Sequence, residues 1–287
     1  MFRRMADVAF RDAQRAQVFD PRVRVVNEFC DELSLEKPGL SVPYVAPHYN
    51  AANATILSLS SNPGPRTSHE GGSGFLSREN DDPIAERMSQ VFATVGLSDE
   101  HVLPWNAYPW HVHQAYPNGL PAGLLAEGLD PLKKLLELHP QIRTVVAHGG
   151  DAKRAMRQFT SKKRFAPLVA ERSLKVWEAR HTSNRAFVMD ATERAAALEA
   201  ICQTYREAMV HVGVRPTHAA RPLIATMRAT PSSGTELVIE VGEVLSGRTD
   251  GATDSQTRSA VRAYLATMSP KRRTELLIEL VTQRLNS

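Results

Sequence analysis

The sequence has few cysteines and no long apolar run. Its 287 residues include only two cysteines, Cys30 and Cys202, which lie far apart in the chain. Two such cysteines supply neither a four-cysteine cluster site nor a CxxC zinc pair, and they do not indicate a disulfide framework. No apolar run approaches the roughly 20 residues that a membrane-spanning helix needs. Residues 1–18 carry several arginines but no apolar core of a signal peptide. These absences predict a soluble, cytoplasmic protein.

A strong excess of one charge is also missing. The chain holds 35 basic and 31 acidic residues, for a net charge of +4, which permits a polyanionic partner without requiring one. The hydrophobic fraction of 42% is enough for a real core. The length fits one large domain, or one domain with a smaller appendage.

Strand-like and helix-like segments alternate between residues 42 and 189. Helices are predicted from Asp82-Pro83 onward, over 129–138, and after His148, where Asp151 is expected to cap the helix. Four short apolar runs are predicted strands: 54–60, 101–106, 144–147 and 174–179. Strands separated by helices predict an α/β fold with three layers (αβα) and a central, mostly parallel four-stranded sheet.

The chain from residue 190 to residue 287 is predicted to be a helical C-terminal extension, which makes 1–189 the sheet domain. Helical patterns cover 193–210 and 270–285, and basic and acidic residues are almost equal in number. Apolar residues recur at helical spacing in Ala195, Leu198, Ile201 and Cys202. This periodicity predicts packing against the sheet domain rather than contact with nucleic acid.

Polar or glycine-rich residues follow each predicted strand. Asn62 follows the first strand, Asn106 ends the second, His148 and Gly149 end the third, and His181 follows the fourth. Because ligands bind beyond the carboxyl ends of the strands in open α/β sheets, these residues predict a polar pocket at one edge of the sheet.

Two of these strand ends resemble motifs of the uracil-DNA glycosylase superfamily. Residues 60–64 (S-S-N-P-G) resemble the first motif of its mismatch-specific branch, G-x-N-P-G, with Ser60 where the motif has Gly. Residues 181–183 (H-T-S) resemble the second motif, H-P-S, with Thr182 in the place of Pro. Segments 72–83 and 105–110 are similar to those of a bacterial subgroup whose first motif reads N-P-G-P. The resemblance covers roughly 42–183, and the lack of a cysteine quartet excludes the iron–sulfur branches.

The resemblance implies that 1–189 is the catalytic domain of a monofunctional DNA glycosylase, which acts on a nucleotide rotated out of the duplex into a pocket. Phe75 is then the candidate platform on which the base stacks, with a core phenylalanine as the alternative. Asn106 is the candidate reader of the Watson–Crick edge, because a side-chain amide both donates and accepts. A locally satisfied turn asparagine is the alternative.

His181 and Asn62 are the candidate catalytic residues. His181 would donate a hydrogen bond to the O2 atom of the departing base, where negative charge develops. Asn62 would orient the attacking water, since an amide is no strong general base. The alternatives are a helix-start histidine and a simple Asn-Pro-Gly turn.

The candidate DNA-binding residues flank these two. The backbone of Pro63 and Gly64 and the hydroxyl of Ser183 would approach neighbouring phosphates. Arg185 is a candidate wedge or phosphate contact. The expected partner is therefore DNA, with no cofactor, metal or membrane, and the chain is expected to be a monomer.

Three other patterns compete with this interpretation. His111 and His113 are spaced for a metal but lack an evident third ligand. Residues 71–75 (G-G-S-G-F) fail the nucleophile-elbow pattern at their last position. Glu79, Asp81 and Asp82 suggest an acidic loop, although Asp82-Pro83 is more typical of a helix cap.

The substrate base stays open at this point. Strict uracil enzymes carry a Tyr after the proline of the first motif, and this chain has Gly64-Pro65 there. The loop from Pro65 to Gly74 is therefore predicted to leave space beside the 5-position of the base. Two enzymatic hypotheses remain: repair of uracil or mismatched thymine, and removal of a hypermodified pyrimidine such as glucosylated hydroxymethylcytosine in anti-phage defence. A third hypothesis is a non-catalytic DNA-binding relative.

Overall fold

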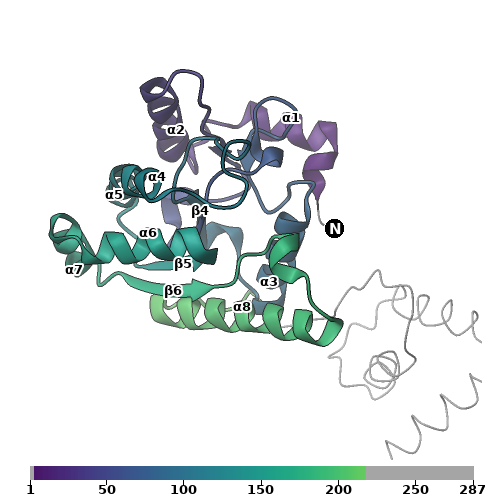
Figure 1. Ribbon diagram of the computed structural model, residues 1–287. Coiled ribbons are helices and arrows are strands. Elements are labelled where there is room, and N and C mark those ends of the chain that lie inside the picture. The colour runs from purple at the N-terminus through teal and green to yellow at the C-terminus, as the bar shows by residue number, and fades with distance from the viewer. Residues whose placement is uncertain (1–2, 218–287) are drawn as a thin grey trace, which may run out of the picture. The chain divides into compact units, whose positions relative to one another are not determined.

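A parallel four-stranded sheet forms the centre of the computed structural model, which describes residues 3–217 (Figure 1). The strand order is β4-β2-β5-β6, and all three neighbouring pairs run parallel. The strands are β2 (Ile56–Ser60), β4 (Val102–Asn106), β5 (Thr144–His148) and β6 (Lys175–Ala179). A separate pair of two-residue strands, β1 (Tyr44–Val45) and β3 (Phe75–Leu76), is also parallel.

The predicted strands and helices of the sheet domain are all present, with small differences at their ends. The helices are α1 (Val8–Ala16), α2 (Arg24–Glu36), α3 (Pro83–Val95), α4 (Ala122–Glu127), α5 (Leu129–Leu138), α6 (Gly149–Ser161), α7 (Ala166–Glu171) and α8 (Ala191–Val212). Asp82 caps α3, because its carboxylate accepts hydrogen bonds from the backbone N–H groups of Ile84 and Ala85. The helix-cap interpretation of Asp82 is thus confirmed.

Helices cover both faces of the sheet, as Figure 1 shows. Helix α6 contacts β2, β5 and β6 on one face, and α4 and α5 lie beside it. Helices α3 and α8 pack against each other, and α8 contacts β2, β5 and β6 on the opposite face. Every residue of β5 is buried, as expected for a strand covered on both sides. The predicted three-layer α/β fold is confirmed.

The register of the sheet aligns the carboxyl ends of its strands. Ser60 at the end of β2 lies opposite Asn106 at the end of β4, and His148 lies opposite Ala179 on β6. The polar residues that follow these strands therefore emerge at the same edge of the sheet.

Helix α8 is the first helix of the predicted extension. Its side chains Ile201 and Cys202 are buried and Leu198 is partly buried, whereas Ala195 is exposed. The predicted packing of this helix against the sheet is thus observed, and its buried face continues through Tyr205, Ala208, Met209 and Val212. The division of the chain at residue 189 stays a prediction, and the helix expected over 270–285 lies outside the described residues.

Asp151 does not cap α6 as expected. The helix begins at Gly149 with His148 as its N-cap, so Asp151 lies within the first turn. Its carboxylate instead accepts hydrogen bonds from the Ser61 hydroxyl and the Leu120 backbone N–H. Tertiary contacts with Ser61, the residue after β2, and with Leu120 have replaced the local cap.

Among the described residues, no helix is long and apolar enough to cross a membrane.

A buried polar chain joins α8 to the sheet. The Tyr205 hydroxyl lies 2.9 Å from His148 Nε2 and 2.8 Å from Ser58 Oγ. His148 Nδ1 faces the Arg180 carbonyl oxygen at 3.3 Å, which only accepts, so Nδ1 carries the ring proton. Burial lowers the pKa of His148 to about 4, which keeps the ring neutral. Tyr205 therefore donates to His148 and accepts from Ser58.

We expect Tyr205→Phe to lower the free energy of unfolding by about 1–3 kcal/mol, because it leaves a buried imidazole nitrogen without its donor. Urea denaturation of the full chain measures this loss. A variant as stable as the wild type would show that the hydrogen bonds among Ser58, Tyr205 and His148 contribute nothing to the attachment of α8.

Candidate active site

A cavity of about 880 Å³ opens at the carboxyl edge of the sheet. Residues at or just beyond the ends of β2, β4, β5 and β6 all contribute to its lining. Seven of the eight predicted site residues line it: Asn62, Pro63, Gly64, Asn106, His181, Ser183 and Arg185. The structure thus brings together residues that are up to 123 positions apart between Asn62 and Arg185.

The proton on the His181 ring has a defined position. The backbone N–H of Ser183 donates to His181 Nδ1 at 3.0 Å. Burial lowers the pKa of His181, against an opposing effect of Asp151, so the ring is neutral near pH 7. A neutral imidazole that accepts at Nδ1 carries its proton on Nε2. His181 therefore offers one N–H donor.

Gly149 sets how closely the β5–α6 turn approaches His181. Its φ of +79° lies in the left-handed region, and an added Cβ would come within 2.9 Å of His181 Cβ. Both observations require glycine at this position. The sequence placed Gly149 at a strand end, but its spacing gave no sign of contact with His181.

Asn62 sits at the end of a short polar chain. Ser61 Oγ lies 3.1 Å from Asn62 Oδ1 and 2.6 Å from Asp151 Oδ2. Burial opposes ionisation of Asp151, but hydrogen bonds from Ser61, Arg154 and the Leu120 N–H outweigh it and lower the pKa of this carboxyl. Asp151 is thus a negative charge one side chain away from Asn62. Sequence reasoning missed this role because it assigned Asp151 to the helix cap.

Asn106 is buried, with 3% of its surface exposed, yet it lines the cavity. Its side-chain amide forms no hydrogen bond with another described residue. A buried amide without a protein partner is costly unless a ligand or water supplies one. This arrangement differs from the satisfied turn asparagine that the sequence left as an alternative.

Phe75 lies apart from the other predicted site residues. It is 2% exposed, sits in β3 and packs against the Tyr44 ring, with the centroids 6.4 Å apart. The cavity lining includes its neighbour Leu76 but not Phe75 itself. The position in the structure corresponds to the core alternative, and stacking on Phe75 remains a prediction.

The turn after β2 presents backbone toward open space. Pro63 is buried, and a Cβ added to Gly64 would meet no atom within 4 Å. His111 Nε2 donates to the Gly64 carbonyl oxygen at 3.1 Å. The described residues contain no group of three potential metal ligands, and His111 braces the turn instead. Arg185, another lining residue, is exposed and donates to Asn118 Oδ1 at 2.6 Å.

The glycine-rich loop does not open the cavity in the way the sequence suggested. Pro65, Arg66 and Thr67 line the cavity, whereas residues 68–74 do not. A Cβ on Gly72 would lie 2.6 Å from the Ser68 carbonyl oxygen and 2.8 Å from that of Arg66. Gly72 thus permits a close approach of backbone within the loop. A bulky residue there would displace the loop rather than fill space beside a base.

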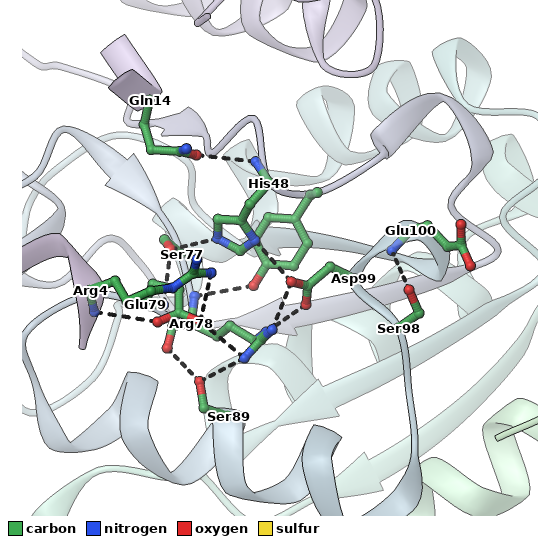
Figure 2. A network of polar contacts seen from close by, with 11 residues as sticks. Arg4, Gln14, His48, Ser77, Arg78, Glu79, Ser89, Ser98, Asp99 and Glu100 are labelled. Atoms are coloured by element: carbon green, nitrogen blue, oxygen red, sulfur yellow. Dashed lines mark hydrogen bonds and ion pairs between the residues drawn. The ribbon is translucent and has the colours of Figure 1, made fainter. Parts of the chain in front are cut away.

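A partly buried polar network holds the segment of Ser77 and Arg78, two residues that line the cavity (Figure 2). His48 Nε2 lies 2.7 Å from Ser77 Oγ, and His48 Nδ1 lies 3.0 Å from Asp99 Oδ2. The order Ser-His-Asp is that of a hydrolase triad. However, Arg78 donates to both Asp99 oxygens, at 2.5 and 2.9 Å, which neutralises the charge that would stabilise an imidazolium. The network braces the segment that carries Ser77 and Arg78 to the cavity.

The comparisons with known proteins agree with this geometry. The model of the uracil DNA glycosylase superfamily matches residues 46–204, more than half of the chain. The chain therefore belongs to the uracil DNA glycosylase superfamily, whose members are DNA glycosylases that act on DNA. No curated protein matches the chain.

If His181 is the catalytic donor that the superfamily motif implies, we expect Gly149→Ala to lower the rate of base excision about 10–100-fold, because the new Cβ displaces His181 and small misplacements of a catalytic group are costly. Gly64→Ala is the matched control, since its φ of −83° suits alanine and its Cβ meets no atom. Single-turnover rates, with melting temperatures as a folding check, make the comparison. Equal rates for the two variants would contradict the contact between Gly149 and the His181 side chain.

Proposed function

We propose that this protein is a monofunctional DNA glycosylase that hydrolyses the N-glycosidic bond of a flipped-out pyrimidine and leaves an abasic site. The observation that carries the proposal is the fixed proton of His181. Its Nδ1 accepts from the Ser183 N–H, so its Nε2–H is free to donate in a cavity shared with Asn62 and Asn106.

The reaction follows from these groups. As the bond between C1′ and the base stretches, negative charge develops on the O2 atom of the pyrimidine, and the Nε2–H of His181 stabilises it. One donor of this kind contributes about 3–4 kcal/mol to the transition state. Water held by Asn62 attacks C1′ of the oxocarbenium-like sugar. The hydroxyl group of the water stays on C1′, and the other proton of the water is released. The base anion takes up a proton as it departs.

The lining of the cavity supports hydrolysis over lyase chemistry. Among the described residues that line it, none is a lysine. An amine would be needed to form a Schiff base with the abasic sugar. The proposed enzyme therefore stops at the abasic site.

Asn106 is the proposed reader of the base. Its unpartnered amide matches a pyrimidine edge with one donor and one acceptor, and rotation of the amide by half a turn suits either a uracil or a cytosine edge. Asn106 alone thus admits both bases.

Two observations favour a base that carries a substituent. The cavity volume of about 880 Å³ lies in the range that holds drug-sized ligands, which are larger than one pyrimidine ring. Ser77, Arg78 and Asn80 line the cavity with polar side chains, which suit a polar substituent on the base. An amino or hydroxyl group on the base would form hydrogen bonds with such side chains. Hypermodified cytosine, removed in anti-phage defence, is therefore the second candidate substrate beside uracil.

A gel assay for alkali-labile sites tests the function, on duplexes that hold uracil, a G·T mismatch, hydroxymethylcytosine or its glucosylated form. We expect excision of at least one of these bases, and a loss of about 100-fold or more in His181→Ala. His101→Ala is the control, because His101 precedes β4 at the opposite, amino end of that strand. Binding without cleavage of any duplex would make the protein a non-catalytic relative.

The pH dependence of excision follows from the lowered pKa of His181. The neutral ring predominates above this pKa, which lies below the ordinary value of about 6.5. We expect a level rate from about pH 6.5 upward, and a falling rate as the pH drops through the pKa of His181. A rate that rises steadily as the pH falls from 7 to 6 would instead indicate that the imidazolium is the active form.

A further inference from the structure

The Ser61 hydroxyl has two possible acceptors but only one proton. Its oxygen lies 2.6 Å from Asp151 Oδ2 and 3.1 Å from Asn62 Oδ1. Hydrogen bonds to a carboxylate are shorter and roughly twice as strong as those between neutral groups. Asp151 is ionised at neutral pH, so the proton of Ser61 goes to Asp151.

Asp151 is held rigidly in this position. The Leu120 backbone N–H donates to Oδ2 at 2.9 Å, and Arg154 donates to Oδ1 at 2.5 Å. The residue also lies in the first turn of the 13-residue helix α6, where the helix dipole favours a negative charge. The carboxylate therefore has little freedom to turn away from Ser61.

We propose that Asp151 is a positioning residue for the hydrolysis, because it withholds the Ser61 proton from Asn62. With that proton committed, the amide oxygen of Asn62 stays free to accept a hydrogen bond from the attacking water. This inference rests on the proposed glycosylase function and on the role of Asn62 in it.

Without Asp151, the Ser61 hydroxyl would lose the acceptor that keeps its proton away from Asn62. The Ser61 hydroxyl would then donate to Asn62 Oδ1, its remaining acceptor, and would compete with water for it. The harm would come from Ser61, so removal of the Ser61 hydroxyl should repair it. A purely structural role of Asp151 predicts the opposite result. The loss of the Ser61 hydroxyl would then add to the loss of the Asp151 carboxylate, and the rate would fall further.

The test is a double-mutant cycle on the full chain, with single-turnover excision of the base that the wild type removes. We expect Asp151→Ala to lower the rate at least 10-fold and Ser61→Ala to lower it only a few fold. The double variant should excise faster than Asp151→Ala alone.

Arg157→Ala serves as the control, because Arg157 lies on the same helix and pairs with the exposed Glu178. Melting temperatures check the fold of each variant. An unchanged rate in Asp151→Ala, or a double variant no faster than it, overturns the inference while the glycosylase function stands. If Asp151→Ala does not fold, a loss in Ser61→Ala as large as in Asn62→Ala overturns it equally. A wild type that excises no base overturns the proposed function and this inference together.

Discussion

The hydrogen bond from the Ser183 backbone N–H to His181 Nδ1 is the contact on which the proposed chemistry of the cavity depends. A backbone N–H only donates, so this bond requires a lone pair on Nδ1 and assigns the ring proton to Nε2. Protonation of Nδ1 would break the bond and set two hydrogens against each other. Burial works in the same direction, because it lowers the pKa of the ring. His181 is thereby a neutral donor rather than an acid.

The sheet and its turns supply what this bond needs. The parallel register brings the ends of β2, β5 and β6 to one edge, and Gly149 allows the turn after β5 to lie against the His181 side chain. Two residues further along that helix, the Asp151 carboxylate accepts a hydrogen bond from Ser61, the residue that follows β2. Two strand ends that carry the proposed catalytic residues are therefore joined through the first turn of α6.

Much of the fold was predictable because its signals are local. Apolar runs that end in polar residues identified the four strands, and the periodicity of Ile201 and Cys202 identified the buried face of α8. Asn62, Asn106 and His181 could be placed at one sheet edge for the same reason. Asp151 could not be assigned, because its choice of Ser61 over the helix N-terminus depends on a contact between distant segments.

The same limit applies to Phe75 and Gly72. The sequence shows a phenylalanine in a glycine-rich setting, but only the pairing of β3 with β1 buries its ring beside Tyr44. The glycines of this loop likewise suggested open space beside the base. Gly72 instead lies so close to the backbone of Arg66 and Ser68 that a Cβ would not fit. Residue type and spacing predict which segments meet at a site. They do not predict the direction in which each side chain points.

The nitrogen-15 NMR spectrum of the His181 imidazole in the full chain at pH 7, assigned by comparison with His181→Ala, tests the assigned proton position most directly. We predict a neutral ring with its proton on Nε2 and an unprotonated Nδ1, unchanged down to about pH 6.5. A proton on Nδ1, or a doubly protonated ring at pH 7, would contradict it.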